Sequence, residues 1–137
     1  MNDEQRSRLI EAAQSAVTGA YAPYSRFRVG AALLAVSGEI YTGCNIENAS
    51  FAATICAERV AIYKAVSEGV TQFEAIAIAS DSHEPCPPCG ICRQVMVEFS
   101  PDMKVLMIGN NAVIERSASD LLPSTFQSHY FAASEDV

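Results

Sequence analysis

Three cysteines and one glutamate have the residue types and spacing of a hydrolytic metal site. Cys56 and Glu58 lie at the predicted start of one helix, and Cys89 and Cys92 lie at the predicted start of another. Positions three apart share one face of a helical turn, so Cys89 and Cys92 can reach the same ion. Zinc held by three protein ligands keeps a fourth tetrahedral position for water, whose proton Glu58 is placed to take. The pattern therefore predicts a catalytic metal centre.

The predicted helix starts also favour the thiolate form of two cysteines. Exposed N–H groups and the helix dipole stabilise an anion at a helix N-terminus, so we expect a lowered thiol pKa at Cys56 and Cys89. Arg59 and Arg93 each lie one residue beyond a core motif and could donate to the sulfurs, offsetting their charge. The alternatives are ordinary buried thiols and solvated charges at Glu58 and Arg93. They do not explain why two helix starts carry cysteines beside a carboxylate.

Cys86 supplies a structural alternative to the catalytic site. With Pro87, Pro88 and Cys89 it forms a C-x-x-C motif, and a fourth thiolate would close the zinc site and exclude water. That arrangement would leave the neighbouring glutamate without a role. The two prolines make the approach to Cys89 stiff and extended, so we expect Cys86 to lie away from the metal.

Composition limits the class of protein. Half of the 137 residues are apolar and 18% are charged, which predicts one domain over residues 1–137 and some apolar surface for a subunit interface. The net charge of −7 offers no basic surface for nucleic acid and favours a small-molecule substrate. His83 and His129, each alone in a polar segment, are interpreted as solvated.

The expected location is the cytoplasm. The chain shows neither a signal segment nor an apolar run long enough to cross a membrane, so no membrane partner is expected. Its five cysteines are an odd number, with three of them close together. In a reducing compartment this pattern favours metal ligation over a disulfide framework.

Apolar periodicity and turn residues divide the chain into alternating helices and strands. Strands are expected over 27–36, 39–44, 73–79, 103–108 and 112–116, and helices over 2–20, 56–68 and 90–99, with a short helix or tail over 120–137. The third strand, the helix after it and the fourth strand form a right-handed crossover. The turn before the last strand is too short for a parallel return, so strands four and five are antiparallel. The predicted fold class is α/β, a single domain with a mixed five-stranded sheet flanked by helices.

Burial is predicted for two of these helices. In the first, Ile10, Ala13, Val17 and Ala20 recur at steps of three and four and define an apolar face. In the helix over 56–68, apolar residues cover much of the circumference, so we expect it to lie in the centre of the domain.

The two cysteine motifs resemble those of the zinc-dependent cytidine deaminases. The class combines three cysteine ligands with a glutamate that is not a ligand. The resemblance extends over nearly the whole chain, and the short length is similar to the small homotetrameric form of the family. The segments that carry it are 21–25, 29–32, 43–49, 56–59, 88–94 and 121–123.

The resemblance implies a role for each matching residue. Phe27 would lie against the pyrimidine, Asn45 and Glu47 would hold the ribose hydroxyls, and the backbone of Ala57 would contact the base. Phe126 matches the aromatic that a neighbouring subunit contributes to the pocket. The implied activity is hydrolysis of cytidine and 2′-deoxycytidine to the uridines in pyrimidine salvage, with one Zn²⁺ per chain, and the implied assembly is a homotetramer.

Three other functions compete with this one. A polynucleotide-editing deaminase shares the motif, but the acidic charge and the antiparallel last strand disfavour it. A deaminase of a cytosine-bearing antibiotic such as blasticidin is a closer rival, although the polar run 45–48 favours a ribose. A zinc-stabilised interaction module is the non-enzymatic alternative.

Overall fold

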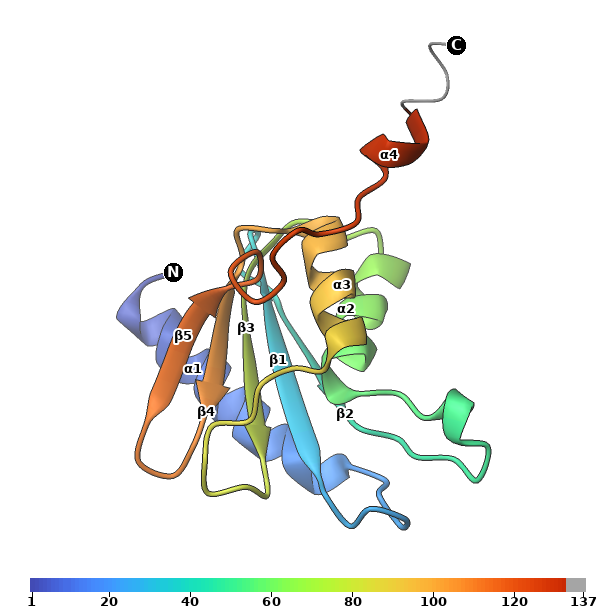
Figure 1. Ribbon diagram of the computed structural model, residues 1–137. Coiled ribbons are helices and arrows are strands. Elements are labelled where there is room, and N and C mark those ends of the chain that lie inside the picture. The colour runs from blue at the N-terminus through green and yellow to red at the C-terminus, as the bar shows by residue number, and fades with distance from the viewer. Residues whose placement is uncertain (133–137) are drawn as a thin grey trace.

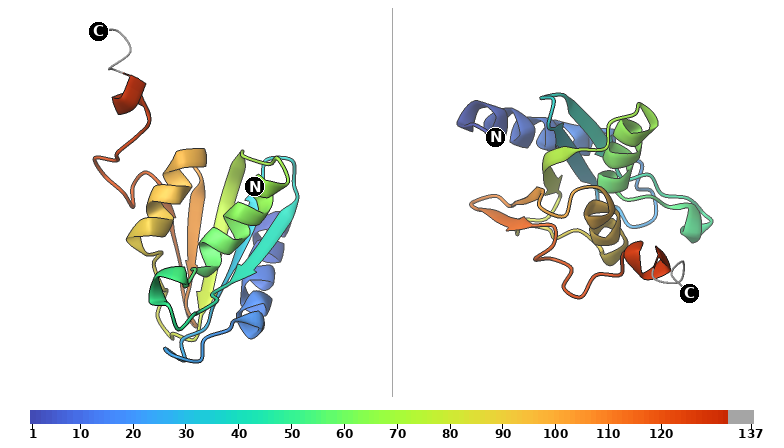
Figure 2. Two further views of the ribbon diagram at one scale, coloured as in Figure 1. Left: turned by 90° about the vertical axis from the view of Figure 1, so that its right-hand side faces the viewer. Right: turned by 90° about the horizontal axis from the view of Figure 1, so that it is seen from above.

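The computed structural model describes residues 1–132, which fold into three layers. Within them, five strands form one sheet in the order β2-β1-β3-β4-β5. Helix α1 covers one face of the sheet, and α2 and α3 lie on the other (Figures 1 and 2). The elements are α1 Asp3–Ala16, β1 Val29–Ala35, β2 Ile40–Cys44, α2 Ala57–Ser67, β3 Phe73–Ser80, α3 Gly90–Phe99, β4 Lys104–Ile108, β5 Val113–Ser117 and α4 His129–Ala132, with short 3-10 turns at Val17–Gly19 and Phe51–Ala53.

The strand pairing agrees with the predicted mixed sheet. β3 and β4 are parallel and are connected through α3, whereas β4 and β5 are antiparallel. β1 pairs antiparallel with both β2 and β3, which places it inside the sheet. The sequence did not predict this strand order, because hairpin formation by β1 and β2 leaves the third strand free to add at either edge.

Side chains of the inner strands alternate between two cores. Along β1, Ala31 and Leu33 face α2 and α3, whereas Ala32 and Leu34 face α1. The continuous apolar run of this strand follows from burial on both faces. The same alternation in β3 directs isoleucines towards α2 and α3 and alanines towards α1. The core between the sheet and α1 is therefore filled by smaller β3 side chains than the core on the other face.

The helix caps explain where α1, α2 and α3 begin. Asn2 caps α1 and forms a capping box with Gln5. Cys56 is the N-cap of α2 and Cys89 is the N-cap of α3, as predicted. Neither cysteine forms a side-chain capping hydrogen bond, so both sulfurs remain available at the helix starts.

Two predicted helix faces need correction. α1 ends at Ala16, and Leu9 and Ala13 are its buried residues, because the helix turns its Leu9 side towards the sheet and leaves Ile10 half-buried. α2 buries one face only, and its Tyr63 is 45% exposed. Tyr63 is therefore exposed on the outer side of α2, whereas Val60 and Val66 are half-buried.

The end of the chain leaves the body of the protein. Leu121 and Leu122 pack against the core, and beyond them the chain extends outward to α4 (Figure 1). The predicted short helix in this segment is confirmed by α4, and residues 133–137 of the same prediction lie outside the described residues. No helix in residues 1–132 has the length and apolar character needed to cross a membrane.

Candidate metal centre and adjoining cavity

Three separate segments are tied together at the end of the sheet where β1 begins. Ile46 exchanges backbone hydrogen bonds of 3.0 Å with Ile55, and it also forms a bridge with Tyr21. The Tyr21 N–H donates to the Asn45 carbonyl at 2.9 Å, and the Glu47 N–H donates to the Tyr21 carbonyl at 2.8 Å. These bonds bring the loop that carries Phe27, the polar run after β2 and the start of α2 to one place.

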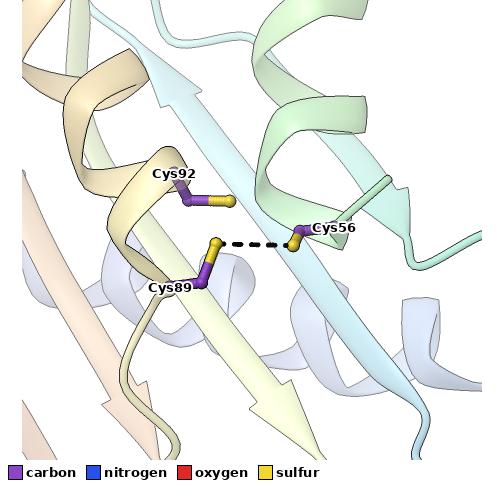
Figure 3. A group of neighbouring side chains, drawn as sticks. All are labelled: Cys56, Cys89 and Cys92. Carbon is purple, nitrogen blue, oxygen red and sulfur yellow. Dashed lines mark hydrogen bonds between the residues drawn. The ribbon is translucent and has the colours of Figure 1, made fainter. Parts of the chain in front are cut away.

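The cysteine sulfurs converge between the first turns of α2 and α3 (Figure 3). Cys56, Cys89 and Cys92 form the His/Cys/Asp/Glu group in the described residues that could hold a metal ion, with all sulfurs within 4.8 Å of one another. The Sγ atoms of Cys56 and Cys89 are 3.6 Å apart. Three sulfurs on a tetrahedral zinc with Zn–S bonds near 2.3 Å lie about 3.8 Å apart. The donor set and its spacing therefore fit zinc.

Arg59 lies against this cluster, as the sequence predicted. Its Nη2 donates to Cys56 Sγ at 3.4 Å, and its Nε is buried without a hydrogen-bond partner among the described residues. A hydrogen bond with Cys92, supported by the Arg59 guanidinium, holds the pKa of the Cys56 thiol well below its ordinary value. The same bond raises the pKa of Cys92. Cys56 is therefore the sulfur that most readily carries a negative charge, which a metal cation would neutralise.

Glu58 lies in the first turn of α2 with only 4% of its surface exposed. Burial raises the pKa of its carboxyl to about 7. A carboxyl group with a pKa near neutral can both accept and release a proton during one reaction cycle. The predicted alternative of a solvated charge in the first helical turn is therefore wrong.

A cavity of about 280 Å³ opens beside the sulfurs. It is lined by most of the residues that the sequence singled out, and also by several that it did not. The predicted ones are Phe27, Asn45, Glu47, Cys56, Ala57, Glu58 and Cys89. The additional ones are Ser25, Val29, Thr54, Ile55, Ile78, Cys86 and Pro87. Cys86 and Pro87 belong to the C-x-x-C motif, and Ser25 and Val29 lie in segments that carry the resemblance, although none of the four was expected in the cavity. No motif marks the other three, which loops and strand ends far apart in the chain bring to the cavity.

Asn45 and Glu47 hold the loop that carries Phe27. The Asn45 side chain accepts from the Val29 N–H at 2.9 Å and donates to the Phe27 carbonyl at 2.8 Å. The Glu47 carboxylate accepts from the backbone N–H groups of Tyr24 and Ser25 and from the Ser25 hydroxyl. Both side chains therefore have structural partners inside the protein as well as open positions towards the cavity.

Four other predicted residues lie outside the sulfur cluster. Arg93 donates to the carbonyls of Pro88 and Leu121, so the prediction that it contacts the sulfurs is wrong. Cys86 is not part of the cluster, as predicted, although it lines the cavity.

His83 contacts Asn110 at 2.6 Å and is thus not simply solvated. The Phe126 side chain is 57% exposed and lines no part of this cavity.

Gly43 of β2 controls how closely α2 approaches the sheet. A Cβ atom at this position would lie 2.5 Å from the Ala57 carbonyl oxygen and 2.6 Å from the Ala61 nitrogen. The substitution Gly43→Ala should therefore push the start of α2 outward, at a cost of about 1–3 kcal/mol in stability. Because that turn carries Cys56 and Glu58, zinc affinity should fall as well, which competition with a metal-binding dye would measure.

Gly30 offers the matched control for this prediction. A Cβ atom there would lie 2.4 Å from the Ala13 carbonyl oxygen of α1, on the opposite face of the sheet. Gly30→Ala should lower the melting temperature to a similar degree and leave zinc affinity unchanged. Equal losses of zinc affinity in both variants would contradict the role given to Gly43.

The fold and the sulfur cluster together define a zinc-binding α/β protein. Residues 3–108 match the family model of the cytidine and deoxycytidylate deaminase zinc-binding region. The chain belongs to this family, which confirms the resemblance seen in its motifs.

Individual relatives agree with this assignment. A cytidine deaminase from Halalkalibacterium halodurans is 50% identical over 123 residues, covering 88% of this chain and 93% of the relative. The crystal structure of cytidine deaminase from Burkholderia pseudomallei superimposes with a TM-score of 0.85 at 45% identity, covering 92% of this chain and 100% of that one. A blasticidin-S deaminase from Bacillus cereus is 30% identical over 128 residues, covering 88% of this chain and 91% of the relative.

Proposed function

We propose that this protein catalyses the hydrolytic deamination of cytidine and 2′-deoxycytidine to uridine and 2′-deoxyuridine, with release of ammonia. The observation that carries the proposal is the buried Glu58 carboxyl, which lines a nucleoside-sized cavity beside three converging thiols. The test is a spectrophotometric assay of the zinc-loaded protein with cytidine. Loss of the cytidine absorbance with stoichiometric ammonia supports the proposal, and a metal-replete protein inert towards free cytosine nucleosides refutes it.

Cys56, Cys89 and Cys92 would hold one Zn²⁺ per chain. When bound, the zinc supplies Lewis acidity that makes water a nucleophile near neutral pH. Arg59, by donating to Cys56 Sγ, would offset part of the negative charge of three thiolates. The ion pair would also satisfy a guanidinium that is otherwise partly unpaired.

Glu58 would move the protons of the reaction. Its carboxylate takes a proton from the attacking water and delivers it to N3 of the pyrimidine while the water oxygen adds to C4. After addition, Glu58 takes a second proton from the new hydroxyl group on C4 and transfers it to the amine at C4, and the C4–N bond then breaks as the C4 carbonyl forms and ammonia is released. A carboxyl pKa of about 7 suits both directions of transfer at neutral pH.

The remaining cavity residues would bind the nucleoside. Phe27 would pack against the pyrimidine ring, and the backbone of Ala57, at the exposed N-terminal turn of α2, would contact the base. Asn45 and Glu47 would bind the ribose hydroxyls with the hydrogen-bonding capacity that their structural bonds leave open. The sugar would then lie at the end of the cavity away from the sulfurs.

Phe126 is proposed to complete the cavity of a neighbouring subunit in a homotetramer. Three observations support this: the side chain is largely exposed, it does not line the cavity of its own chain, and the chain beyond β5 extends outward from the body of the protein (Figure 1). Phe126→Ala should raise KM for cytidine roughly 2- to 10-fold through loss of an aromatic contact. Steady-state kinetics and zinc analysis check this, because zinc content should be unchanged. A monomer in sedimentation analysis that retains full kcat/KM contradicts the proposal.

A blasticidin-like substrate is the second candidate. It is favoured by the relative of that name, whereas the higher identity to the cytidine deaminase favours the nucleoside. Comparing kcat/KM for cytidine and blasticidin S separates the two candidates. We also propose that residues 1–137 form one cytoplasmic domain that does not act on polynucleotides. Binding to single-stranded RNA or DNA that weakens with salt would oppose it.

A further inference from the structure

The Ser25 hydroxyl lies at the centre of a small hydrogen-bond network at the edge of the cavity. It donates to Glu47 Oε2 and accepts from the backbone N–H of Phe27 at 3.0 Å. The other carboxylate oxygen, Glu47 Oε1, accepts from the backbone N–H of Tyr24 at 2.9 Å and from that of Ser25 at 3.1 Å. One serine therefore links the carboxylate of Glu47 to the loop that carries Phe27.

The two carboxylate oxygens of Glu47 differ in what they can still accept. A carboxylate oxygen has two lone-pair positions. Both positions of Oε1 are used by backbone donors, whereas Oε2 has one donor, the Ser25 hydroxyl. A sugar hydroxyl that donates to Glu47 must therefore bind Oε2, immediately beside Ser25 Oγ.

Ser25 also favours the ionised form of Glu47. Hydrogen bonds from the Ser25 hydroxyl and from the backbone of the same loop hold the pKa of Glu47 below its ordinary value. An ionised carboxylate is an acceptor only, and hydrogen bonds to charged groups are the stronger ones. The free position on Oε2 is thus a strong acceptor whose direction depends on the serine.

Asn45 does not depend on Ser25 in this way. Its amide is buried, and both ends of the amide are fixed by the backbone of β1 and of the preceding residues. Removal of the Ser25 hydroxyl should therefore leave Asn45 in place and release Oε2 of Glu47, together with the Phe27 N–H.

We propose that Ser25 is a positioning residue that directs Glu47 Oε2 to the sugar hydroxyls and thereby determines the preference for nucleosides that carry them. This inference rests on the proposed nucleoside deaminase function. Its effect is on recognition of the sugar and not on the chemical step at the pyrimidine.

The test compares cytidine with 2′,3′-dideoxycytidine in the zinc-loaded wild-type protein and in Ser25→Ala. The ratio of kcat/KM for cytidine to that for dideoxycytidine should fall roughly 10-fold or more in the variant, because the hydrogen bond to a charged acceptor is misdirected. Any shift of Phe27 affects both substrates and cancels in the ratio. Ser25→Thr keeps a hydroxyl and should retain the wild-type ratio. Ser37→Ala, in the exposed turn after β1, is the matched control.

The outcomes distinguish a role of Ser25 in sugar recognition from a role in supporting the loop. A ratio that stays at the wild-type value in Ser25→Ala, even if both activities fall, shows that Ser25 only supports the loop and overturns the inference. If Ser25→Ala does not fold, Ser25→Cys takes its place, because it keeps the volume but has a weak S–H donor. A wild-type protein that turns over neither nucleoside refutes the proposed function, and this inference with it. An active wild type with an unchanged ratio in the variant refutes the inference alone.

Discussion

Replacement of Glu58 by glutamine should reduce kcat for cytidine by a factor of roughly 10²–10⁴ or more, because a positioned proton-transfer group contributes about that much to rate. The glutamine amide has nearly the same shape and fits the buried position in the first turn of α2. It cannot accept the proton of the attacking water or return one to the leaving amine. Zinc content and melting temperature should remain at wild-type values, or the melting temperature should rise, since no buried carboxyl is left to desolvate.

The control for this prediction is Glu68→Gln, which removes an exposed carboxylate at the other end of the same helix. Its kcat should equal that of the wild type. Metal analysis must accompany the kinetics, so that loss of activity is not confused with loss of zinc. If Glu58→Gln retains zinc and more than a tenth of wild-type kcat, another group performs the proton transfers.

Replacement of Cys89 by serine should remove zinc and destabilise the protein. A ligand present at 1,000 times its Kd stabilises the folded state by about 4 kcal/mol. For a domain of this size, loss of that contribution lowers the melting temperature by roughly 10–15 °C. Elemental analysis after dialysis and a thermal scan with and without added zinc measure the two effects. A chelator should lower the melting temperature of the wild type to nearly that of the variant.

Cys86→Ser is the informative comparison, because Cys86 and Cys89 belong to the same C-x-x-C motif. Cys86 lies outside the cluster of three sulfurs, and its thiol donates a hydrogen bond to the Pro87 carbonyl at 3.7 Å. We expect one zinc per chain and an unchanged response to chelator. Loss of zinc in Cys86→Ser would mean that four thiolates close the site, and the hydrolytic function would have to be abandoned.

The sequence predicted the elements best where turn and cap residues bound them. α3 begins at Gly90 and ends at Phe99 as expected, because prolines precede its N-cap and follow its end. The buried face of the first helix was predicted less well. Leu9 and Ile10 are both apolar and adjacent, so the sequence alone does not show which of them faces the sheet. Leu9 faces the sheet, a result that depends on how the helix packs against β1 and β3 and not on its own periodicity.

In the candidate site, too, residues set by local spacing were predicted and residues brought in by the fold were missed. Cys56, Cys89 and Cys92 were found by spacing, because each helix start fixes the position of a sulfur relative to its own helix. Ser25 lies in a segment that carries the resemblance but was given no role, and Ile78 was not found, since both reach the cavity only through the folding of distant segments. Arg93 was assigned wrongly, because its neighbouring position in the chain says nothing about the carbonyl groups that the fold brings to it.

Cys56, Ala57 and Glu58 are consecutive residues on one helical turn, and this has a consequence for repair of the enzyme after metal loss. The Val60 N–H donates to the Cys56 carbonyl at 3.2 Å and closes this turn, so we expect the sulfur, the backbone contact for the base and the carboxyl to keep their mutual geometry when the ion leaves. Only α3, with the other two sulfurs, has to be brought back into register with that turn. Reloading with zinc should then require only that the first turns of α2 and α3 return to their relative positions, because each turn holds its own site residues.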